Sequence, residues 1–331
     1  MPSTEPHTLS VTNGRKVLVV GGTGSVGRAI TRALIDNTSA QVTVFSRDET
    51  KQYEMTSDPF FRRERVRFVV GDVRDQASIS RAVRDQDFVF HTAAMKHVPF
   101  CEENALEAVR TNVIGTGNLI DAVMNESSVK KVVVCSTDKA CSPTTTMGAT
   151  KMLQERLIQS SHHGGPSMVC VRLGNLFESR GSVFHLFFKQ RENGIITLTD
   201  VEMTRFISTL DEVVDTMTYA LCDGKHGSII IRQDKAVKMF DVAHAIAPQA
   251  DIKTVGIRKN EKLHELLFNE HEARCIRIDG DHFILEQTGL VQREVEHRDW
   301  TSQGRAVSAT EAYSIVERFA DRCGYVLKQV K

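Results

Sequence analysis

Residues 135–151, CSTDKACSPTTTMGATK, hold the side chains of this chain that are best suited to acid–base chemistry. Asp138 and Lys139 are neighbours, so a carboxyl group and an amine could exchange protons with the same ligand. Burial and mutual charge would tune the pair for proton transfer near neutral pH. The segment follows a β-branched run, and ligands of open α/β sheets bind where strands end. The alternative interpretation is an ion pair on the surface.

Met147 and Lys151 belong to the same stretch and lie four residues apart, so they share one face of a helix. Lys151 brings an amine to that face, whereas the thioether of Met147 carries no titratable proton. A solvated helix lysine is the alternative interpretation of Lys151. The catalytic candidates of the whole stretch are Ser136, Thr137, Asp138, Lys139, Met147 and Lys151.

A glycine-rich loop at residues 21–27, GGTGSVG, follows an apolar run and opens a helical pattern. Its three evenly spaced glycines allow a tight turn and a close approach of backbone N–H groups to a pyrophosphate. This context predicts dinucleotide binding, and a turn without a ligand is the alternative. The residues expected to form the site are Gly21, Thr23, Gly24, Ser25, Val26 and Gly27.

The end of the next β-branched run favours NADP over NAD. Ser46, Arg47 and Lys51 stand where an acidic residue would bind a ribose 2′-hydroxyl and repel a 2′-phosphate. Serine and arginine can bind that phosphate. The alternative is that Arg47 pairs with Asp48 or Glu49 on a solvated loop. Further residues expected to border the coenzyme are Asp72, Val73, Ala93, Ala94, Lys96, Asn112 and Lys151.

These residues must be positioned by an alternation of β-branched runs and helical stretches that begins at Lys16. That rhythm predicts a parallel sheet with crossover helices. The expected fold is α/β: a Rossmann-type doubly wound sheet over residues 14–174, with a smaller substrate domain over 175–331 from which later segments return to the sheet. Helices are expected at 25–37, 102–124, 147–160 and 239–247, and Phe184, Phe187 and Phe188 are expected in the core or a subunit interface.

The composition limits the partners. The 331 residues include 42 basic and 42 acidic side chains, so no broad basic field is available for nucleic acid or an anionic membrane. No apolar run reaches the roughly 18 residues of a membrane span, and the start has no apolar signal-peptide core. We expect a cytoplasmic protein. Seven scattered cysteines predict reduced thiols and no metal site.

Several motifs resemble those of one enzyme family. They include TNVIGTGNLIDA, STDKA, MGATK, RLGNLFESRGSV, MTRF and the GIRKNEKLHE segment, in order between Lys16 and Glu286. The chain is similar to extended short-chain dehydrogenases/reductases, and more narrowly to bacterial C5-inverting UDP-N-acetylglucosamine 4,6-dehydratases of the capsule and pseudaminic-acid type. Met147 departs from the family's Tyr-x-x-x-Lys motif, because it stands at the tyrosine position.

The resemblance implies a reaction. NADP⁺ takes a hydride from sugar C4, a base removes the C5 proton, an acid helps the C6 hydroxyl leave, and the hydride returns to C6. Lys139 would be the C5 base, Asp138 the C6 acid, and Lys151 would hold the nicotinamide ribose. Thr137 or Ser136, with Lys139 or a water as relay, would replace the missing tyrosine. The residues expected to bind a UDP-sugar are Lys96, Asn175, Arg180, Ser182, Arg205, Arg258 and Glu261.

Two other functions fit the same sequence. A nucleotide-sugar 4-epimerase shares the oxidation at C4 but has no leaving water to protonate, so Asp138 and Lys139 speak against it. A non-catalytic protein that senses NADP is favoured only by Met147. The resemblance also implies a homo-oligomer. The sequence leaves open the nucleotide, the C2 substituent, the configuration at C5 and the size of the oligomer.

Overall fold

One large sheet forms the centre of the fold. The computed structural model describes residues 8–161, 164–287 and 298–327. The main sheet has nine strands in the order β14-β15-β10-β6-β5-β4-β1-β2-β3. From β10 to β3 all neighbours are parallel, whereas β15 is antiparallel to both β10 and β14. The strands are β1 (Lys16–Val20), β2 (Gln41–Ser46), β3 (Val66–Val70), β4 (Phe88–His91), β5 (Lys131–Thr137), β6 (Ser167–Leu173), β10 (Ile229–Arg232), β14 (Ile276–Asp279) and β15 (His282–Leu285).

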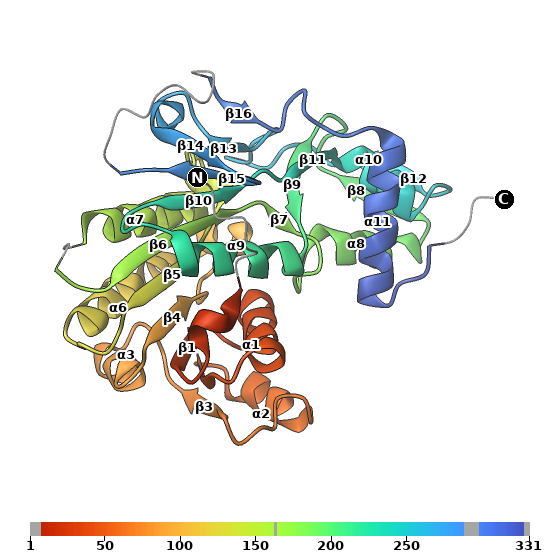
Figure 1. The fold of residues 1–331 in the computed structure, drawn as a ribbon. Coiled ribbons are helices and arrows are strands. Elements are labelled where there is room, and N and C mark those ends of the chain that lie inside the picture. Colours follow the sequence, from red (N-terminus) through yellow and green to blue (C-terminus); the bar gives the residue numbers. More distant parts are fainter. Residues whose placement is uncertain (1–7, 162–163, 288–297, 328–331) are drawn as a thin grey trace.

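Helices cover both faces of this sheet, as Figure 1 shows. One face packs against α1 (Ser25–Asn37) and α9 (Leu210–Asp223), and the other against α3 (Gln76–Val83), α6 (Gly115–Met124) and α7 (Thr146–Ser160). The central strands are apolar on both sides because both sides are buried. The doubly wound Rossmann-type fold predicted from the sequence is confirmed.

Three further short elements of this half precede or follow its strands. They are η1 (Leu9–Thr12), α2 (Glu49–Ser57) and the 3-10 turn η3 (Asp138–Ala140), which follows β5 directly. The phosphate loop between β1 and α1 and the turn η3 after β5 both lie at the carboxyl edge of the sheet. The strand pairing therefore brings the two predicted sites to the same edge.

The prediction of one helix over residues 102–124 is wrong. The structure has α4 (Val98–Glu103), α5 (Ala105–Ala108), the π-helix η2 (Val109–Ile114) and α6. The first break falls at Asn104, whose backbone has φ −128° and ψ 53°. In η2, the buried amide of Asn112 bonds the backbone of Met95 and the hydroxyl of Thr150. A π-helical turn of this kind is common at functional sites, and apolar periodicity does not reveal it.

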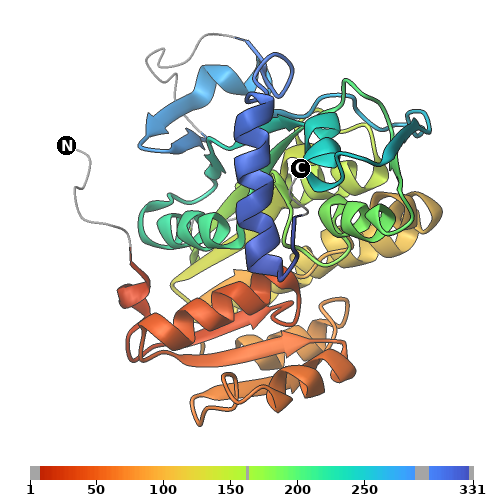
Figure 2. The ribbon, with the colours of Figure 1, turned by 90° about the vertical axis from the view of Figure 1, so that its right-hand side faces the viewer.

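A smaller unit lies at the carboxyl edge, with β7 (Asn175–Leu176), β8 (Ile195–Leu198), β9 (Thr204–Ser208), β11 (Lys235–Lys238) and β12 (Asp251–Thr254). Its helices are α8 (Val183–Arg191), α10 (Met239–Ile246) and α11 (Ala309–Cys323), and α11 runs along its outside in Figure 2. Phe184, Phe187 and Phe188 lie in its buried core, as expected. Strands β10, β14 and β15 return to the main sheet, beside β13 (Leu266–Phe268), η4 (Glu272–Cys275) and β16 (Trp300–Thr301).

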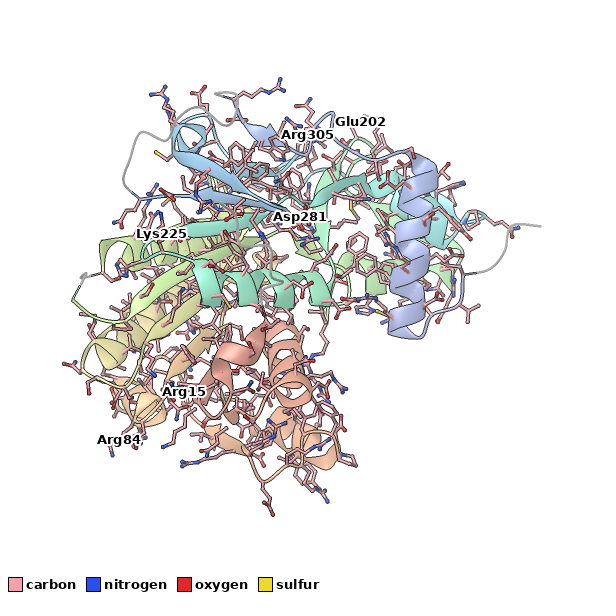
Figure 3. All side chains as sticks on the ribbon, in the orientation of Figure 1. Arg15, Arg84, Glu202, Lys225, Asp281 and Arg305 are labelled. Carbon is pink, nitrogen blue, oxygen red and sulfur yellow. The ribbon has the colours of Figure 1, made fainter. Side chains whose placement is uncertain are left out.

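Charged side chains extend from widely separated elements. Arg15, Arg84, Lys225 and Glu202 project at the periphery in Figure 3, and each is exposed. In residues 8–161, 164–287 and 298–327, no helix is both long and apolar enough to cross a membrane. The seven cysteines are unpaired, three of them buried and four partly exposed. The predicted absence of a signal peptide concerns a start whose first seven residues lie outside the described part.

Candidate active site

The glycine loop is shaped for a close-lying ligand. Gly21 has φ +80°, and a Cβ added there would lie 2.5 Å from the backbone nitrogen of Ala93. A Cβ on Gly27 would lie 2.5 Å from the carbonyl oxygen of Gly21. Gly24 is the N-cap of α1, so the positive end of the helix dipole faces the loop. The main chain therefore forms a cradle that fits the pyrophosphate of a dinucleotide.

Arg180 and Lys96 reach this loop from other parts of the chain. The Arg180 backbone N–H donates to Ser25 Oγ at 3.1 Å, and its guanidinium donates to the carbonyl oxygen of Thr23. Lys96 Nζ donates to the carbonyl oxygen of Arg180 at 3.1 Å. Burial, with the charge of Arg180, lowers the pKa of Lys96. These cations, predicted to bind substrate, thus lie beside the phosphate loop, where a diphosphate of either ligand could meet them.

The residues predicted to select NADP lie together at the end of β2. Ser46 Oγ shares a 2.8 Å hydrogen bond with Thr23 Oγ1, and Lys51 pairs with Asp48. Arg47 is 57% exposed, and its guanidinium lies 4.0 Å from Asp72. Its partner is thus Asp72, not either of the acidic neighbours considered from the sequence. This exposed pair leaves the guanidinium within reach of a ligand phosphate.

The other residues predicted to contact the coenzyme differ in how deeply they are buried. Val73 is buried and packs against Gly115, whereas Ala94 is exposed beside Ala93 at the end of β4. Asn112 is fully buried, and both ends of its amide bond the backbone of Met95. Asn112 therefore fixes the segment that carries residues 93–96 rather than facing an open cleft.

Lys139 lies between two carboxylates at the end of β5. Its Nζ is 3.0 Å from Asp138 Oδ1 and 3.4 Å from Glu265 Oε1, and it donates to Asn175 Oδ1 at 2.9 Å. We call Asp138, Lys139 and Glu265 the Lys139 cluster. Asp138 Oδ2 and Glu265 Oε2 are buried without a hydrogen-bond partner. Such unsatisfied polar atoms are uncommon in native proteins and often mark sites with a chemical role.

The expectation that Lys139 would titrate near neutral pH is wrong for this structure. Burial alone would lower its pKa, but the negative charges of Asp138 and Glu265 outweigh burial and raise the pKa above its usual value. The sequence showed only the adjacent carboxylate, and the second one comes from 126 residues further along the chain. Lys139 is therefore protonated in the ligand-free protein at neutral pH.

Glu265 also belongs to the site, although it was not among the residues predicted from the sequence. It lies just before β13 and is 2% exposed, and its carboxylate is within 4.0 Å of three cations, Lys139, Arg205 and Lys262. Lys262 Nζ in turn donates to the carbonyl oxygen of Cys141 at 2.7 Å, which ties this segment to the residue after η3. The one available signal was its position as the last residue of the GIRKNEKLHE segment.

Lys151 and Met147 project from the first turns of α7. Lys151 Nζ donates to the carbonyl oxygen of Cys135 at 2.6 Å and contacts Gln154. Burial lowers the pKa of Lys151. Met147 is 5% exposed and packs with Cys101 and Ala108 in a small apolar cluster. The thioether of Met147 has no titratable proton, so this residue has no part in acid–base chemistry.

The two hydroxyls before Asp138 point to different partners. Thr137 Oγ1 donates to Asp138 Oδ1 at 2.9 Å, which connects it to the Lys139 cluster. Ser136 Oγ donates to Glu155 Oε1 at 2.7 Å, on the other side of the strand. Glu155 and Glu272 both pair with the fully buried Arg172, at 2.8 and 2.9 Å. Of the two proposed relays, only Thr137 touches the candidate acid.

The predicted substrate residues occupy three environments. Arg205 is 4% exposed, and its guanidinium donates to the carbonyl oxygens of Thr204, Lys262 and Leu263, while it pairs with Glu261 at 3.4 Å. Arg258 is exposed in the loop between β12 and β13. Ser182, the N-cap residue of α8, donates to the carbonyl oxygen of Phe177. Arg258 is thus free to reach a ligand, whereas Arg205 supports the segment that carries Glu265.

Comparison with known proteins places this site in a family. The family described as "Polysaccharide biosynthesis protein" matches residues 17–286. The chain belongs to this family. An inverting UDP-N-acetylglucosamine 4,6-dehydratase of Campylobacter jejuni is 40% identical over 268 residues, 79% of each chain. A UDP-glucose 4-epimerase of Rickettsia conorii is 38% identical over 314 residues, which cover 91% of this chain and 90% of the relative.

The solved structure of Pen from Bacillus thuringiensis is 34% identical and superposes with a TM-score of 0.87, covering 93% of this chain and 98% of that one. Membership of the polysaccharide biosynthesis family confirms the resemblance that the sequence motifs indicated. The family match contains the phosphate loop, η3, α7 and the segment that ends at Glu265. Because the named relatives are a dehydratase and an epimerase, the family assignment supports an enzyme.

Proposed function

We propose that this protein is an NADP-dependent UDP-N-acetylglucosamine 4,6-dehydratase that inverts C5. The observation that carries the proposal is Lys139 held between Asp138 and Glu265, with an unpartnered oxygen on each carboxylate. An elimination needs a base and an acid at neighbouring carbons of one ligand. The relative from Campylobacter jejuni, named as this enzyme, supports the choice of substrate.

The coenzyme would supply the oxidation. A nicotinamide dinucleotide bound along the glycine loop accepts a hydride from the sugar and returns it. Gly21, Gly24 and Gly27 would bind its pyrophosphate, and Ser46 and Arg47 its 2′-phosphate. Lys151 would hold the nicotinamide ribose, and its bond to the carbonyl oxygen of Cys135 fixes the amine at the end of β5.

Lys139 must release a proton to become a base, and Asp138 must take one up to become an acid. At rest Lys139 is charged, and its Nζ donates to Asp138 Oδ1 at 3.0 Å. Loss of a proton from Nζ would give a neutral amine, and uptake of a proton by Asp138 would give a carboxylic acid. The amine can then remove the C5 proton, and the acid can protonate the departing C6 hydroxyl.

Thr137 would take the place of the missing tyrosine at O4. Its hydroxyl donates to Asp138 Oδ1, so a proton that leaves O4 for Thr137 can pass on to that carboxylate. Ser136 donates its hydroxyl hydrogen bond to Glu155, so it would act only by stabilising β5. Arg180, Lys96 and Arg258 would bind the diphosphate of the UDP-sugar, with Asn175 and Glu261 nearer its sugar and ribose. The active form would be a cytoplasmic homo-oligomer.

A nucleotide-sugar 4-epimerase is the second candidate, because the Rickettsia conorii relative carries that name and aligns with more of this chain. An epimerase rotates a 4-keto sugar and does not remove a C5 proton. It therefore has no use for a buried amine between two carboxylates. Exchange of hydrogen at C5 separates the two reactions.

The test is one incubation of the purified protein with UDP-N-acetylglucosamine and NADP⁺ in deuterated water, followed by NMR. The dehydratase should give a 4-keto-6-deoxy sugar with deuterium at C5 and inverted configuration there. Epimerisation would give a C4 epimer that keeps its C5 hydrogen, and would refute the proposal. UDP-glucose in a parallel incubation tests the role of the C2 substituent.

A further inference from the structure

The protons released and consumed during the proposed dehydration must balance. Oxidation at C4 releases the O4 proton, and the departing C6 hydroxyl later consumes one. Removal and return of the C5 proton cancel. The protein must therefore hold the O4 proton from the first half of the reaction until the second, while Lys139 is free of its own proton so that it can act as the base.

Two protons must accordingly be stored at the moment of C5 abstraction, one from O4 and one that Lys139 has released. Asp138 can hold one of them and is needed as the acid at C6. Asn175, the third group bonded to Nζ, accepts through an amide oxygen and does not take up a proton. Met147 has no proton-accepting group of this kind. Among the described residues in contact with Lys139, the remaining acceptor is Glu265, whose Oε1 lies 3.4 Å from Nζ.

We propose that Glu265 takes the proton that Lys139 releases, so that Lys139 becomes the neutral base while Asp138 holds the proton from O4. This inference rests on the proposed function. The transfer breaks an N–H bond at Nζ and forms an O–H bond at Glu265, leaving the electron pair on nitrogen. Three groups then carry two protons, on Asp138 and Glu265.

The charged groups around Lys139 and Glu265 come from η3, β9 and the segment before β13. Lys139 faces Asp138 from η3, Glu265 from the segment before β13, and Arg205 from β9. Glu265 faces Lys139, Arg205 at 3.9 Å and Lys262 at 4.0 Å. Three cations thus surround its carboxylate. Its buried, unpartnered Oε2 is a vacant acceptor position.

The cycle closes without solvent. Abstraction at C5 returns a proton to Lys139, and Asp138 gives its proton to the departing water. Two protons then remain, on Lys139 and Glu265. One of them goes to C5 to form the product, and the other restores the charged Lys139 between two carboxylates. The start and the end of the cycle therefore have the same protonation.

The experiment is a pH profile of Glu265→Gln beside the parent, with UDP-N-acetylglucosamine and NADP⁺. The variant cannot store the second proton, so Lys139 must lose it to solvent before the reaction. We expect dehydration at pH 7 to fall by about 10²-fold, in the range for loss of a proton-transfer group, and to recover as the pH is raised towards 10. Single-turnover C4 oxidation should persist, because Asp138 can still take the O4 proton.

The matched control is Glu270→Gln, five residues further along, whose side chain is 63% exposed. It should keep the parent's profile. If Glu265→Gln does not fold, Glu265→Asp decides: a shorter carboxylate should keep a pH-independent rate near neutrality, and activity only at alkaline pH would overturn the inference. An unchanged profile for Glu265→Gln, or equal loss of oxidation and dehydration at every pH, would also overturn it. A parent that never dehydrates the substrate refutes the proposed function itself.

Discussion

Two clusters of charged side chains lie near the end of β5, and they differ in how completely their carboxylate oxygens are bonded. The Lys139 cluster leaves one oxygen of each carboxylate without a partner. The second cluster, Glu155, Arg172 and Glu272, is saturated: Arg172 bonds both carboxylates and the carbonyl oxygen of Leu267. Two adjacent residues of β5 contact the two clusters: Ser136 donates to Glu155, and Thr137 donates to Asp138.

The difference separates a structural cluster from a reactive one. A buried ion network with every group satisfied is rigid and holds its elements in one arrangement. A cluster with unsatisfied oxygens can accept protons or a ligand, at a cost in stability. We therefore expect substitutions in the Lys139 cluster to act on catalysis and substitutions in the Arg172 cluster to act on folding.

The largest effect should follow Lys139→Met, which removes the base but keeps an extended side chain. Loss of a general base typically costs about 10²- to 10⁴-fold in rate, so product should nearly vanish, together with deuterium exchange at C5. Coenzyme and UDP-sugar should still bind. NMR in deuterated water measures product and exchange together.

Asp138→Asn is the matched variant, because it keeps shape and polarity but loses the acid. It should lose dehydration to a similar degree while retaining some exchange at C5. A Lys139→Met protein that dehydrates UDP-N-acetylglucosamine within a few-fold of the parent would show that the base lies elsewhere in the pocket.

Arg172→Met should give the largest loss of stability. It leaves the buried Glu155 and the partly buried Glu272 without their cation, and breaking a buried ion pair in this way costs about 3–5 kcal/mol. Urea unfolding monitored by circular dichroism measures the change. Arg156→Met, on the exposed side of α7, should change stability by about 0.5 kcal/mol or less. A loss below about 1 kcal/mol for Arg172→Met would mean that the network is not structural.

Asp234 is a buried carboxylate that belongs to neither cluster. Its partners only partly compensate for its burial, so it should lower the stability of the fold. It accepts from Ser208 Oγ at 2.5 Å, lies 3.8 Å from Arg232 and leaves Oδ1 unpartnered. Burial, opposed by the Ser208 hydrogen bond and reinforced by the charge of Glu212, raises its pKa to about 7.

Because the folded-state pKa lies above the ordinary value of 3.8, this group favours folding below pH 4, and the contribution is lost as the pH rises to about 7. Asp234→Asn should remove that loss. It should gain stability relative to the parent between pH 4 and 8, by roughly 4 kcal/mol at most at about 1.4 kcal/mol per pKa unit. Thermal unfolding across this range measures the gain. A difference from the parent that does not vary with pH would contradict the assignment.

The smallest effect should come from Arg47→Ala. The exposed Arg47–Asp72 pair contributes about 0–1 kcal/mol, so a 2′-phosphate can replace Asp72 at little cost. The variant should bind NADP⁺ about tenfold more weakly, equivalent to about 1.4 kcal/mol, with NAD⁺ binding unchanged. Calorimetric titration with both coenzymes measures this. Equal loss for the two, or none, would show that Arg47 faces solvent in the complex.

Most of the coenzyme half could be predicted because its signals are local. The alternation of β-branched runs and helical stretches from Lys16 predicted the parallel sheet, and the helix expected at 25–37 is α1. The region 102–124 failed because its breaks depend on Asn104 and on the buried bonds of Asn112 to Met95 and Thr150. Those bonds join residues up to 38 positions apart, beyond the reach of a periodicity.

By itself the sequence determined the fold class, the phosphate loop and the pairing of Asp138 with Lys139, because each depends on residues adjacent or regularly spaced along the chain. Only the tertiary structure decided the electrostatics of the site. Glu265 lies 126 residues from Lys139 in the sequence but contacts it in the fold. The pKa of Lys139, expected near neutral pH, is therefore raised above its usual value. The charge of a buried group depends on every neighbour within a few ångströms, and the neighbours of Lys139 come from η3, β7, β9 and the segment before β13.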